Sequence, residues 1–499
     1  MTKDKRSERR IEWFLAGGLI LLLVWTPQVF WPTDPETVDA ASLILGLSAL
    51  VAFFKGLGLA PPMSRLPLIA LRLCQGLLFG LMLLVMGWMH ACGYLVAALV
   101  SIPLAIGLGT LHVLTFFSCL TLYGRRPSMR PRLLVALALM LFVGNLQFVA
   151  WAAWMWSPPS AEVCEEVAAA PEVTRLSPAT WPQEPSHPYD LIYIPEEGWL
   201  FASFKMGGNG AMAWWDNHEA NRVFGINTQK GAEKSVIPLP GRPLPQYMTY
   251  RAETRELVVS RMGPTQSSLD LVDLSAAPEL KVTRSRSVDF SSHELVSHPT
   301  EPRFGVFGDH GEFFTMEEGS LELSSMTQIE KPDDHGAVTL NAWHRPGSSK
   351  VYVNFLLYPM AEIDMDTGQV RWTEVLFGGG QLAGRSDLNE VYQSDMLLNR
   401  VDVIETETMA LSRRLELDYA PRPLVVDPQR DLLVVGGWLD GRVRFYRLST
   451  LSKLDSSAEL GPYLRDFAYD ARRGVLYAGS KCGVFELALD TILGARAAD

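Results

Sequence analysis

The sequence lacks the short motifs that mark the common enzyme classes. It has no G-x-S-x-G turn, no H-E-x-x-H pair, no Walker phosphate loop and no C-x-x-C pair, which are signatures of hydrolases, metalloproteases, nucleotide-binding enzymes and thiol oxidoreductases. A run of three glycines, Gly378-Gly379-Gly380, has no helical segment after it and does not predict a phosphate-binding loop. We therefore predict no catalytic residue and no cofactor.

Basic residues are scarce in most of the chain. Residues 157–499 contain 32 Lys and Arg against 49 Asp and Glu, a balance of −17. This balance excludes the basic strip that nucleic-acid binding requires. Residues 1–156 contain 12 basic and 6 acidic residues and are otherwise mostly apolar. The two parts of the chain therefore need separate interpretations.

The first part is rich in long apolar runs. They lie near residues 11–31, 41–60, 67–90, 95–122 and 133–156. A membrane-spanning helix needs about 20 such residues, so the pattern predicts five transmembrane helices within residues 1–156. Lys and Arg precede the first run and fill alternate loops, which predicts a cytoplasmic amino terminus. The expected location is the inner membrane, with several membrane passes and with residues from 157 onward in the periplasm or outside the cell.

Residues 157–187 are rich in proline and predict an extended linker with room for one strand. Beyond it, a polar turn followed by an apolar strand recurs seven times. The strands begin at Leu200, Leu257, Phe304, Val351, Val391, Leu432 and Val475, with spacings of 57, 47, 47, 40, 41 and 43. Periods of this length with several short strands are typical of β-propeller blades.

A second polar turn follows most of these strands about 15 residues later. Asp366-Thr367-Gly368 and Asp490-Thr491 are examples. Asp and Thr side chains accept bonds from the backbone two residues on, so we interpret these turns as capped rather than as ligand sites.

The unit DPQRDLLVVGG, followed by VRFYRLST, resembles the YVTN-type repeat of seven-bladed propellers in the bacterial cell envelope. The resemblance covers residues 188–499. It implies four strands per blade and a ring closed by pairing the two ends of the domain. A WD40-like propeller fits less well, since no run of GH and WD signatures is present. The expected fold class is a five-helix transmembrane bundle followed by an all-β seven-bladed propeller.

The last repeat contains three strands and lacks an outer one. Residues 172–176 (EVTRL), upstream of the first repeat, are expected to supply it and so remove an exposed strand edge.

Several loops on one face of the expected ring carry His, Asp and Trp. These candidate ligand-binding residues are Trp215, His218, His293, Asp309, His310, Asp333 and His335. His with Asp suits a transition metal or acid–base work, and carboxylates on the same loops suit calcium. Asp-His-Gly is also a good turn sequence, so the identity of any metal stays open.

Cys164 and Cys482 are the only cysteines after residue 156. They would form a disulfide in an oxidising compartment. The expected closure, with an extended spacer, separates them by about 20 Å at 3.3 Å per residue, so paired and unpaired states both remain open.

The function that fits best is a membrane-anchored recognition or scaffold domain for a protein, peptide or envelope ligand. The alternative is a membrane-tethered enzyme of the lactonase or quinoprotein kind, with a metal or cofactor on the loops.

Overall fold

The computed structural model describes part of the chain. The described residues are 161–176, 187–206, 222–229, 233–239, 244–262, 267–290, 292–308, 311–317, 320–329, 339–355, 358–375 and 380–494. The chain divides into two units, Met1–Ser157 and Pro158–Asp499. All described residues belong to the second unit.

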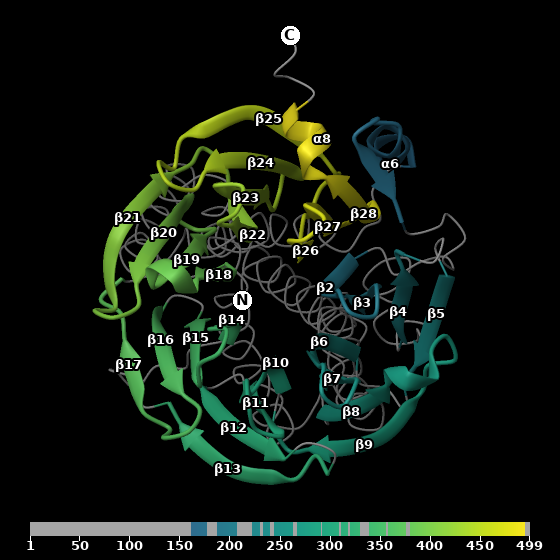
Figure 1. Cartoon of the computed structure of the whole chain (residues 1–499), viewed down its shortest axis with the longest axis vertical. Coiled ribbons are helices and arrows are strands. Elements are labelled where there is room, and N and C mark those ends of the chain that lie inside the picture. The colour runs from purple at the N-terminus through teal and green to yellow at the C-terminus, as the bar shows by residue number, and fades with distance from the viewer. Residues whose placement is uncertain are drawn as a thin grey trace, which may run out of the picture. The chain divides into compact units, whose positions relative to one another are not determined.

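Seven four-stranded antiparallel sheets are arranged around a central axis, so the fold is a seven-bladed β-propeller (Figure 1). Blade 1 contains β2 (His187–Ile194), β3 (Trp199–Met206), β4 (Arg222–Asn227) and β5 (Glu233–Pro238). Blade 2 contains β6 (Leu244–Arg251), β7 (Glu256–Met262), β8 (Ser267–Asp273), the 3-10 helix η2 (Leu274–Ala276) and β9 (Val282–Val288). Blade 3 contains β10 (Ser292–Ser297), β11 (Arg303–Gly308), β12 (Glu312–Glu317) and β13 (Leu323–Gln328).

The next blades repeat this order from the axis outward. Blade 4 contains β14 (Thr339–His344), β15 (Lys350–Phe355), β16 (Tyr358–Asp364) and β17 (Val370–Trp372). Blade 5 contains β18 (Leu382–Arg385), the 3-10 helix η3 (Ser386–Leu388), β19 (Glu390–Asp395), β20 (Arg400–Glu405) and β21 (Ala410–Glu416). Blade 6 contains β22 (Pro421–Asp427), β23 (Leu432–Gly437), β24 (Arg442–Arg447) and β25 (Lys453–Glu459).

Blade 7 is built from both ends of the domain. Its order is β1 (Val173–Arg175), β28 (Gly483–Ala488), β27 (Val475–Ser480) and β26 (Asp466–Asp470). The register pairs Val173 with Leu487 and Arg175 with Phe485. The predicted closure by residues 172–176 is thereby confirmed, and each of the seven predicted strand starts lies in the second strand of its blade.

The middle strands of the blades are apolar because both of their faces are covered. In β23, Leu433 and Val435 pack toward blade 5, while Leu432 and Val434 pack toward blade 7. The outer strand β25 instead alternates exposed and buried residues, as expected when one face meets solvent. The hydrophobic core therefore runs between blades as a series of clusters around the ring.

The fold-class prediction needs a correction. Among the described residues there are two α-helices, α6 (Ala161–Ala168) and α8 (Leu489–Gly494), and none of those residues forms a helix long and apolar enough to cross a membrane. An eight-residue helix is about 12 Å long at 1.5 Å per residue, far short of the hydrocarbon thickness. The transmembrane bundle predicted for residues 1–156 lies outside the described residues, and the fold established here is the propeller alone.

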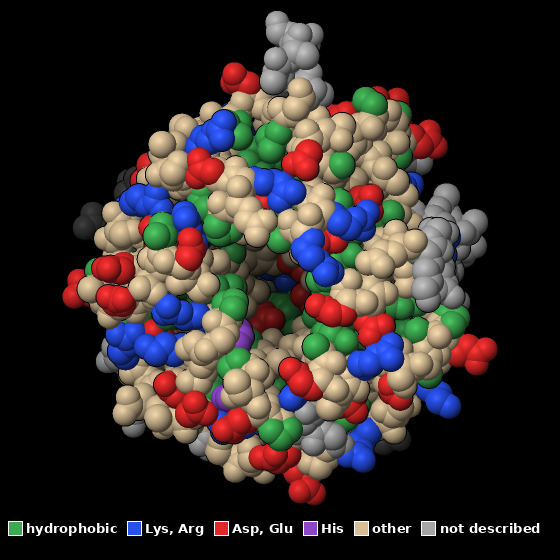
Figure 2. All heavy atoms as spheres, viewed as in Figure 1, with side chains coloured by type: hydrophobic (Ala, Val, Ile, Leu, Met, Phe, Trp, Pro, Cys, Tyr) green, Lys and Arg blue, Asp and Glu red, His purple; other side chains and the backbone are tan. Residues whose placement is uncertain are grey.

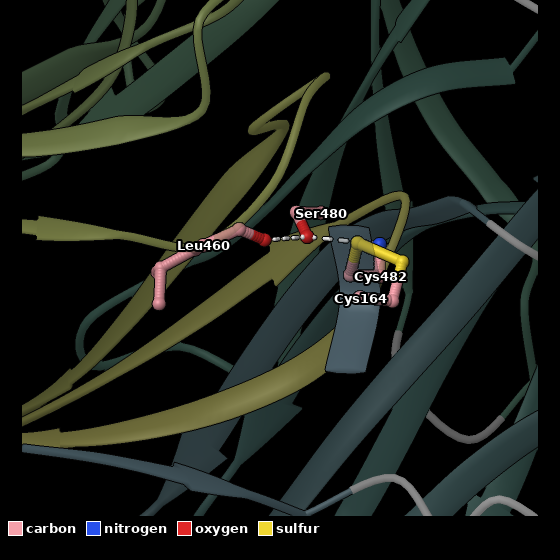
Figure 3. The surroundings of a disulfide bond; sticks show 4 residues. All are labelled: Cys164, Leu460, Ser480 and Cys482. Atoms are coloured by element: carbon pink, nitrogen blue, oxygen red, sulfur yellow. Dashed lines mark hydrogen bonds between the residues drawn. A yellow bond between two sulfur atoms is a disulfide. The ribbon is translucent and has the colours of Figure 1, made fainter. Parts of the chain in front are cut away.

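The segment before the ring also differs from the prediction of an extended spacer. Its first part is the helix α6, which packs beside β1. Cys164 in α6 forms a disulfide with Cys482, and the two Cα atoms are 5.0 Å apart (Figure 3). Gly461 has a φ of +81°, and a Cβ there would lie 2.5 Å from the Cys482 sulfur, so glycine is required beside the bond.

Antiparallel order gives the ring two distinct faces. The "loop face" carries the connections between blades and the loops between the second and third strands of each blade. We call "turn face" the one with the turns between first and second and between third and fourth strands. Inner strands such as β22 begin at the loop face and end at the turn face.

Candidate functional site

Polar side chains of the inner strands line the axis of the ring and tie neighbouring blades together. Asp466 of blade 7 accepts a hydrogen bond from the backbone N–H of Leu191 in blade 1, at 2.6 Å. Asp190 of blade 1 accepts one from Met248 in blade 2, at 2.7 Å. Bonds of this kind cross the blade boundaries close to the axis, so they fix the width of the central channel.

The other side of the channel uses an amide in the same way. Asn341 of blade 4 accepts a bond from the Leu382 N–H at 2.8 Å and donates to Glu294 of blade 3 at 3.1 Å. Gln381 reaches across from blade 5 and donates to Asp466 at 2.5 Å. Figure 2 shows the centre of the ring hollowed, with acidic side chains inside the hollow.

Three carboxyl groups, those of Asp190, Glu294 and Asp466, interact in this channel, and burial there favours their protonated forms. Burial, and then the charge of Asp466, raise the pKa of Asp190 well above its ordinary value, and the two carboxyls hydrogen-bond to one another. Burial and the charge of Asp466 raise the pKa of Glu294 in the same way. Burial also raises the pKa of Asp466, opposed by the Leu191 N–H and Gln381. Asp466 accepts hydrogen bonds from the Leu191 N–H and from Gln381, which favours its charged form and opposes the effect of burial.

Aromatic rings surround the channel near the loop face. The Tyr247 ring lies 5.2 Å from that of Tyr189 and 5.1 Å from that of His293, centroid to centroid. The Tyr247 hydroxyl donates to the Leu340 carbonyl at 2.9 Å. This places the predicted residue His293 in the wall of the channel, 5% exposed.

The other predicted site residues lie outside the described residues. They are Trp215, His218, Asp309, His310, Asp333 and His335. Their convergence with His293 therefore stays a prediction. The described structure brings His293 together with tyrosines of blades 1 and 2.

A second group of side chains continues around the channel mouth over blades 6, 7 and 1. The Arg422 guanidinium lies 5.5 Å from the Trp438 ring, and Trp438 lies 5.5 Å from Tyr463. The Lys481 ammonium is 5.8 Å from Tyr463. Arg465 lies 4.1 Å from the Tyr189 ring. We call this group the cation–aromatic arc: Tyr189, Arg422, Trp438, Tyr463, Arg465 and Lys481.

Backbone hydrogen bonds between loops hold the arc in place. The Leu464 N–H donates to the Trp438 carbonyl at 3.1 Å, and the Lys481 N–H donates to the Pro462 carbonyl at 3.1 Å. The arc is largely buried, and burial lowers the pKa of Lys481 to about 8. Arg422 and Arg465 are each 8% exposed. Among the ion pairs formed by described residues, none includes either of these arginines.

One cluster has the composition of a metal site. His298, Glu301 and Asp366 place a ligand atom each within 4.8 Å of one another on the turn face. However, the His298 Nδ1 accepts the N–H groups of Thr300 and Glu301, and its Nε2 lies 3.2 Å from Asp366. The Arg303 guanidinium also bonds to Asp366. A cation therefore already occupies this position, and the cluster joins blades 3 and 4.

The sequence interpretation missed the channel carboxyls and the arc, although one signal was present. A polar residue precedes the apolar part of several inner strands, at Asp190-Leu191, Glu294-Leu295, Asn341-Ala342 and Asp466-Phe467. Alignment of the blades on their inner strands, rather than on their second strands, brings these residues into register.

Comparison with known proteins adds no assignment. No protein-family model matches the chain, and no curated protein matches it. The class of protein is therefore defined by the structure: a seven-bladed β-propeller with a polar channel and a cationic, aromatic mouth on its loop face.

Proposed function

We propose that this chain is an extracytoplasmic recognition domain of the YVTN type, which binds a protein or peptide partner at the loop-face mouth of its channel. The observation that carries the proposal is the cation–aromatic arc. Trp, Tyr and Arg are the residue types that dominate binding energy at protein interfaces. Their concentration beside a channel matches the usual place of ligands on propellers.

The disulfide supports the extracytoplasmic part of the proposal. Cys164 and Cys482 are separated by 318 positions, and such bonds persist in oxidising compartments and are rare in the cytosol. In intact cells, alkylation of these two thiols is expected only after a reductant is added. Alkylation without reductant would contradict this location.

Quantitative affinity purification of the full chain tests the recognition role. Trp438→Leu removes an indole of the arc but keeps apolar volume, so partners bound at the mouth are expected to be lost. Arg472→Ala changes an exposed residue of the turn face and is the matched control, which should capture the same partners as the unaltered chain. Capture of one unchanged set of proteins by both variants would refute binding at this mouth.

An enzymatic function has one observation in its favour. Asp190 and Asp466 share a hydrogen bond at raised pKa, and such pairs are suited to general acid–base work. A screen of lactone and ester hydrolysis, compared with Asp466→Asn, tests this alternative. Activity that survives Asp466→Asn unchanged would exclude the pair as its catalytic centre.

A further inference from the structure

Arg422 and Arg465 are buried and form no ion pair with described residues, unlike the buried Arg261 and the half-buried Arg444. Arg261 pairs with Asp270 at 2.5 Å, and Arg444 pairs with Asp440 at 2.5 Å. For Arg422, the described polar contact of the guanidinium is a 3.5 Å bond to the sulfur of Met396. Its Nε is buried and has no hydrogen-bond partner among the described residues.

A buried guanidinium without an ion-pair partner cannot become neutral by losing its proton. Arginine stays charged in proteins, and an unpaired buried charge opposes folding. The Trp438 and Tyr189 rings offset part of this through cation–π attraction, which is weaker than a desolvated ion pair. A buried cation that no described residue neutralises is the expected state of a site whose counter-ion arrives with a ligand.

The chemistry of the arc selects among anions. A guanidinium presents a planar fork that fits carboxylates and phosphates. Asp190 directly follows Tyr189 in the chain, and Asp466 directly follows Arg465. The negative charge that this carboxyl pair keeps repels a doubly charged phosphate more than a singly charged carboxylate. The flat faces of Trp438 and Tyr463 beside the cations suit a peptide, as at interface hot spots.

We infer that the cation–aromatic arc binds an acidic segment of a protein partner, with Arg422 and Arg465 engaging its carboxylates. The inference rests on the proposed function and names the chemistry of the partner. Trp438 and Tyr463 pack against the segment between the two arginines. The site thus binds side-chain or terminal carboxylates of the partner, although residues 157–499 of this chain are acidic overall.

The test measures retention of the full chain on immobilised decapeptides. One set is rich in Glu and Asp, and its matched set carries Gln and Asn at the same positions. We expect about tenfold or stronger retention on the acidic set, the loss typical of removing one partner of a buried charge pair. The double variant Arg422→Gln/Arg465→Gln should lower retention on the acidic set to that of the amide set.

Two further variants separate charge from fold. Arg422→Lys keeps the positive charge but loses the fork, so intermediate retention is expected. Arg442→Gln removes an exposed arginine of the same blade, paired with Glu459 at 3.1 Å, and should change nothing. Thermal melts of each variant show whether it is folded, and Arg422→Lys keeps the test decisive if a Gln variant does not fold.

The outcomes distinguish this inference from the proposed function. Equal retention on acidic and amide peptides, or acidic retention unchanged in the double variant, overturns the inference while recognition at the mouth stands. Stronger competition by inorganic phosphate or by an oligomer of uronic acid than by free acidic peptide also overturns it, in favour of those ligands. If Trp438→Leu leaves every captured partner in place, the proposed function fails first, and the inference fails with it.

Discussion

The two ends of strand β22 show how differently the faces of the ring are built. At the turn face, Asp427 is 1% exposed and accepts bonds from the Gln429 N–H at 2.9 Å and from the Arg430 guanidinium at 3.0 Å. At the loop face, Arg422 of the same strand is also buried, but its described contacts are a sulfur atom and an indole ring. At the turn face, groups of the same chain therefore bind the buried charge, whereas at the loop face no described residue forms an ion pair with it.

This difference extends to the pKa values of capping carboxyls. On the turn face, the Ser275 hydroxyl and N–H lower the pKa of Asp273. On the loop face, Asp395 caps the N–H groups of Leu397 and Leu398, yet burial raises its pKa to about 6. At these two positions, the turn face stabilises the carboxylate of Asp273, whereas burial at the loop face disfavours the carboxylate of Asp395. Such strained electrostatics are typical of binding sites.

The largest effect is expected from removing the disulfide at the loop face. Cys164→Ala/Cys482→Ala removes the bond between α6 and the β27–β28 turn. We expect the free energy of unfolding to fall by about 2–4 kcal/mol, because a long loop in the unfolded chain is no longer constrained. Denaturant titration with and without reductant measures it, with unaltered chain in reductant as control. Equal thiol counts with and without reductant in the denatured protein would show that the bond is absent.

Asp427→Ala tests whether the turn face is structural. It removes the carboxylate that binds the Tyr469 hydroxyl of blade 7 and one side of the Arg430 guanidinium, which keeps Asp490 and the Ala471 carbonyl as partners. We expect a loss of about 2–3 kcal/mol and no change in partner capture. The control is Glu459→Ala, whose pair with Arg442 is exposed on both sides and should contribute less than about 0.5 kcal/mol. Weakened partner capture in folded Asp427→Ala would blur the distinction between the faces.

Asp395→Asn tests the difference between the two faces through the pH dependence of stability. The ordinary pKa of Asp395 is 3.8 and the folded value is about 6, so the folded state holds the extra proton between these values. The stability contributed by this group is therefore present below pH 3.8 and lost as pH rises through 6. We expect the unaltered chain to lose about 1–2 kcal/mol relative to Asp395→Asn between pH 4 and 7.

Asp273→Asn is the opposite control. The folded pKa of Asp273 is lowered, so its contribution is present above the unfolded pKa and disappears as pH falls. The two variants should therefore diverge from the unaltered chain in opposite directions in melts across this range. Parallel curves for both would mean that the faces do not differ in this respect.

The smallest expected effect is on Arg422 itself. Arg422→Met replaces a buried charge that forms no ion pair with any described residue by an apolar side chain of similar length. We expect stability to rise by about 1 kcal/mol, since replacements of buried charges are often stabilising. Arg444→Met, which strands Asp440, is the control and should lower stability. Calorimetry of both variants gives the signs. A fall for Arg422→Met would show that the protein itself already neutralises this charge.

Much of the propeller was predictable because its signals are local. Turn residues before each second strand gave the seven blades, and the missing strand of the last repeat pointed to residues 172–176. The pairing of Cys164 with Cys482 was left undecided because the spacer was taken as extended. In a helix the rise per residue is 1.5 Å rather than about 3.3 Å, and α6 brings Cys164 back beside the β27–β28 turn.

The site was less predictable because its contacts are remote in sequence. The bond from Leu191 to Asp466 spans 275 positions, and no local pattern announces it. His293 was predicted to lie in a loop of one face, but the structure places it in the inner strand β10, beside Tyr247 of another blade. Arg422 drew no attention in the sequence, and its burial follows from the packing of Met396 and Trp438 around it.

The closure of blade 7 also bears on how the cell handles incomplete copies of this protein. The strand β1 pairs along only three residues, and its partner β28 follows all the other blades in the chain. A product terminated early would expose unmatched strand edges on both sides of the gap, where proteases and holdase chaperones engage. The ring closes only in chains that include β28, so chains that stop before it should be removed by degradation rather than retain partial activity.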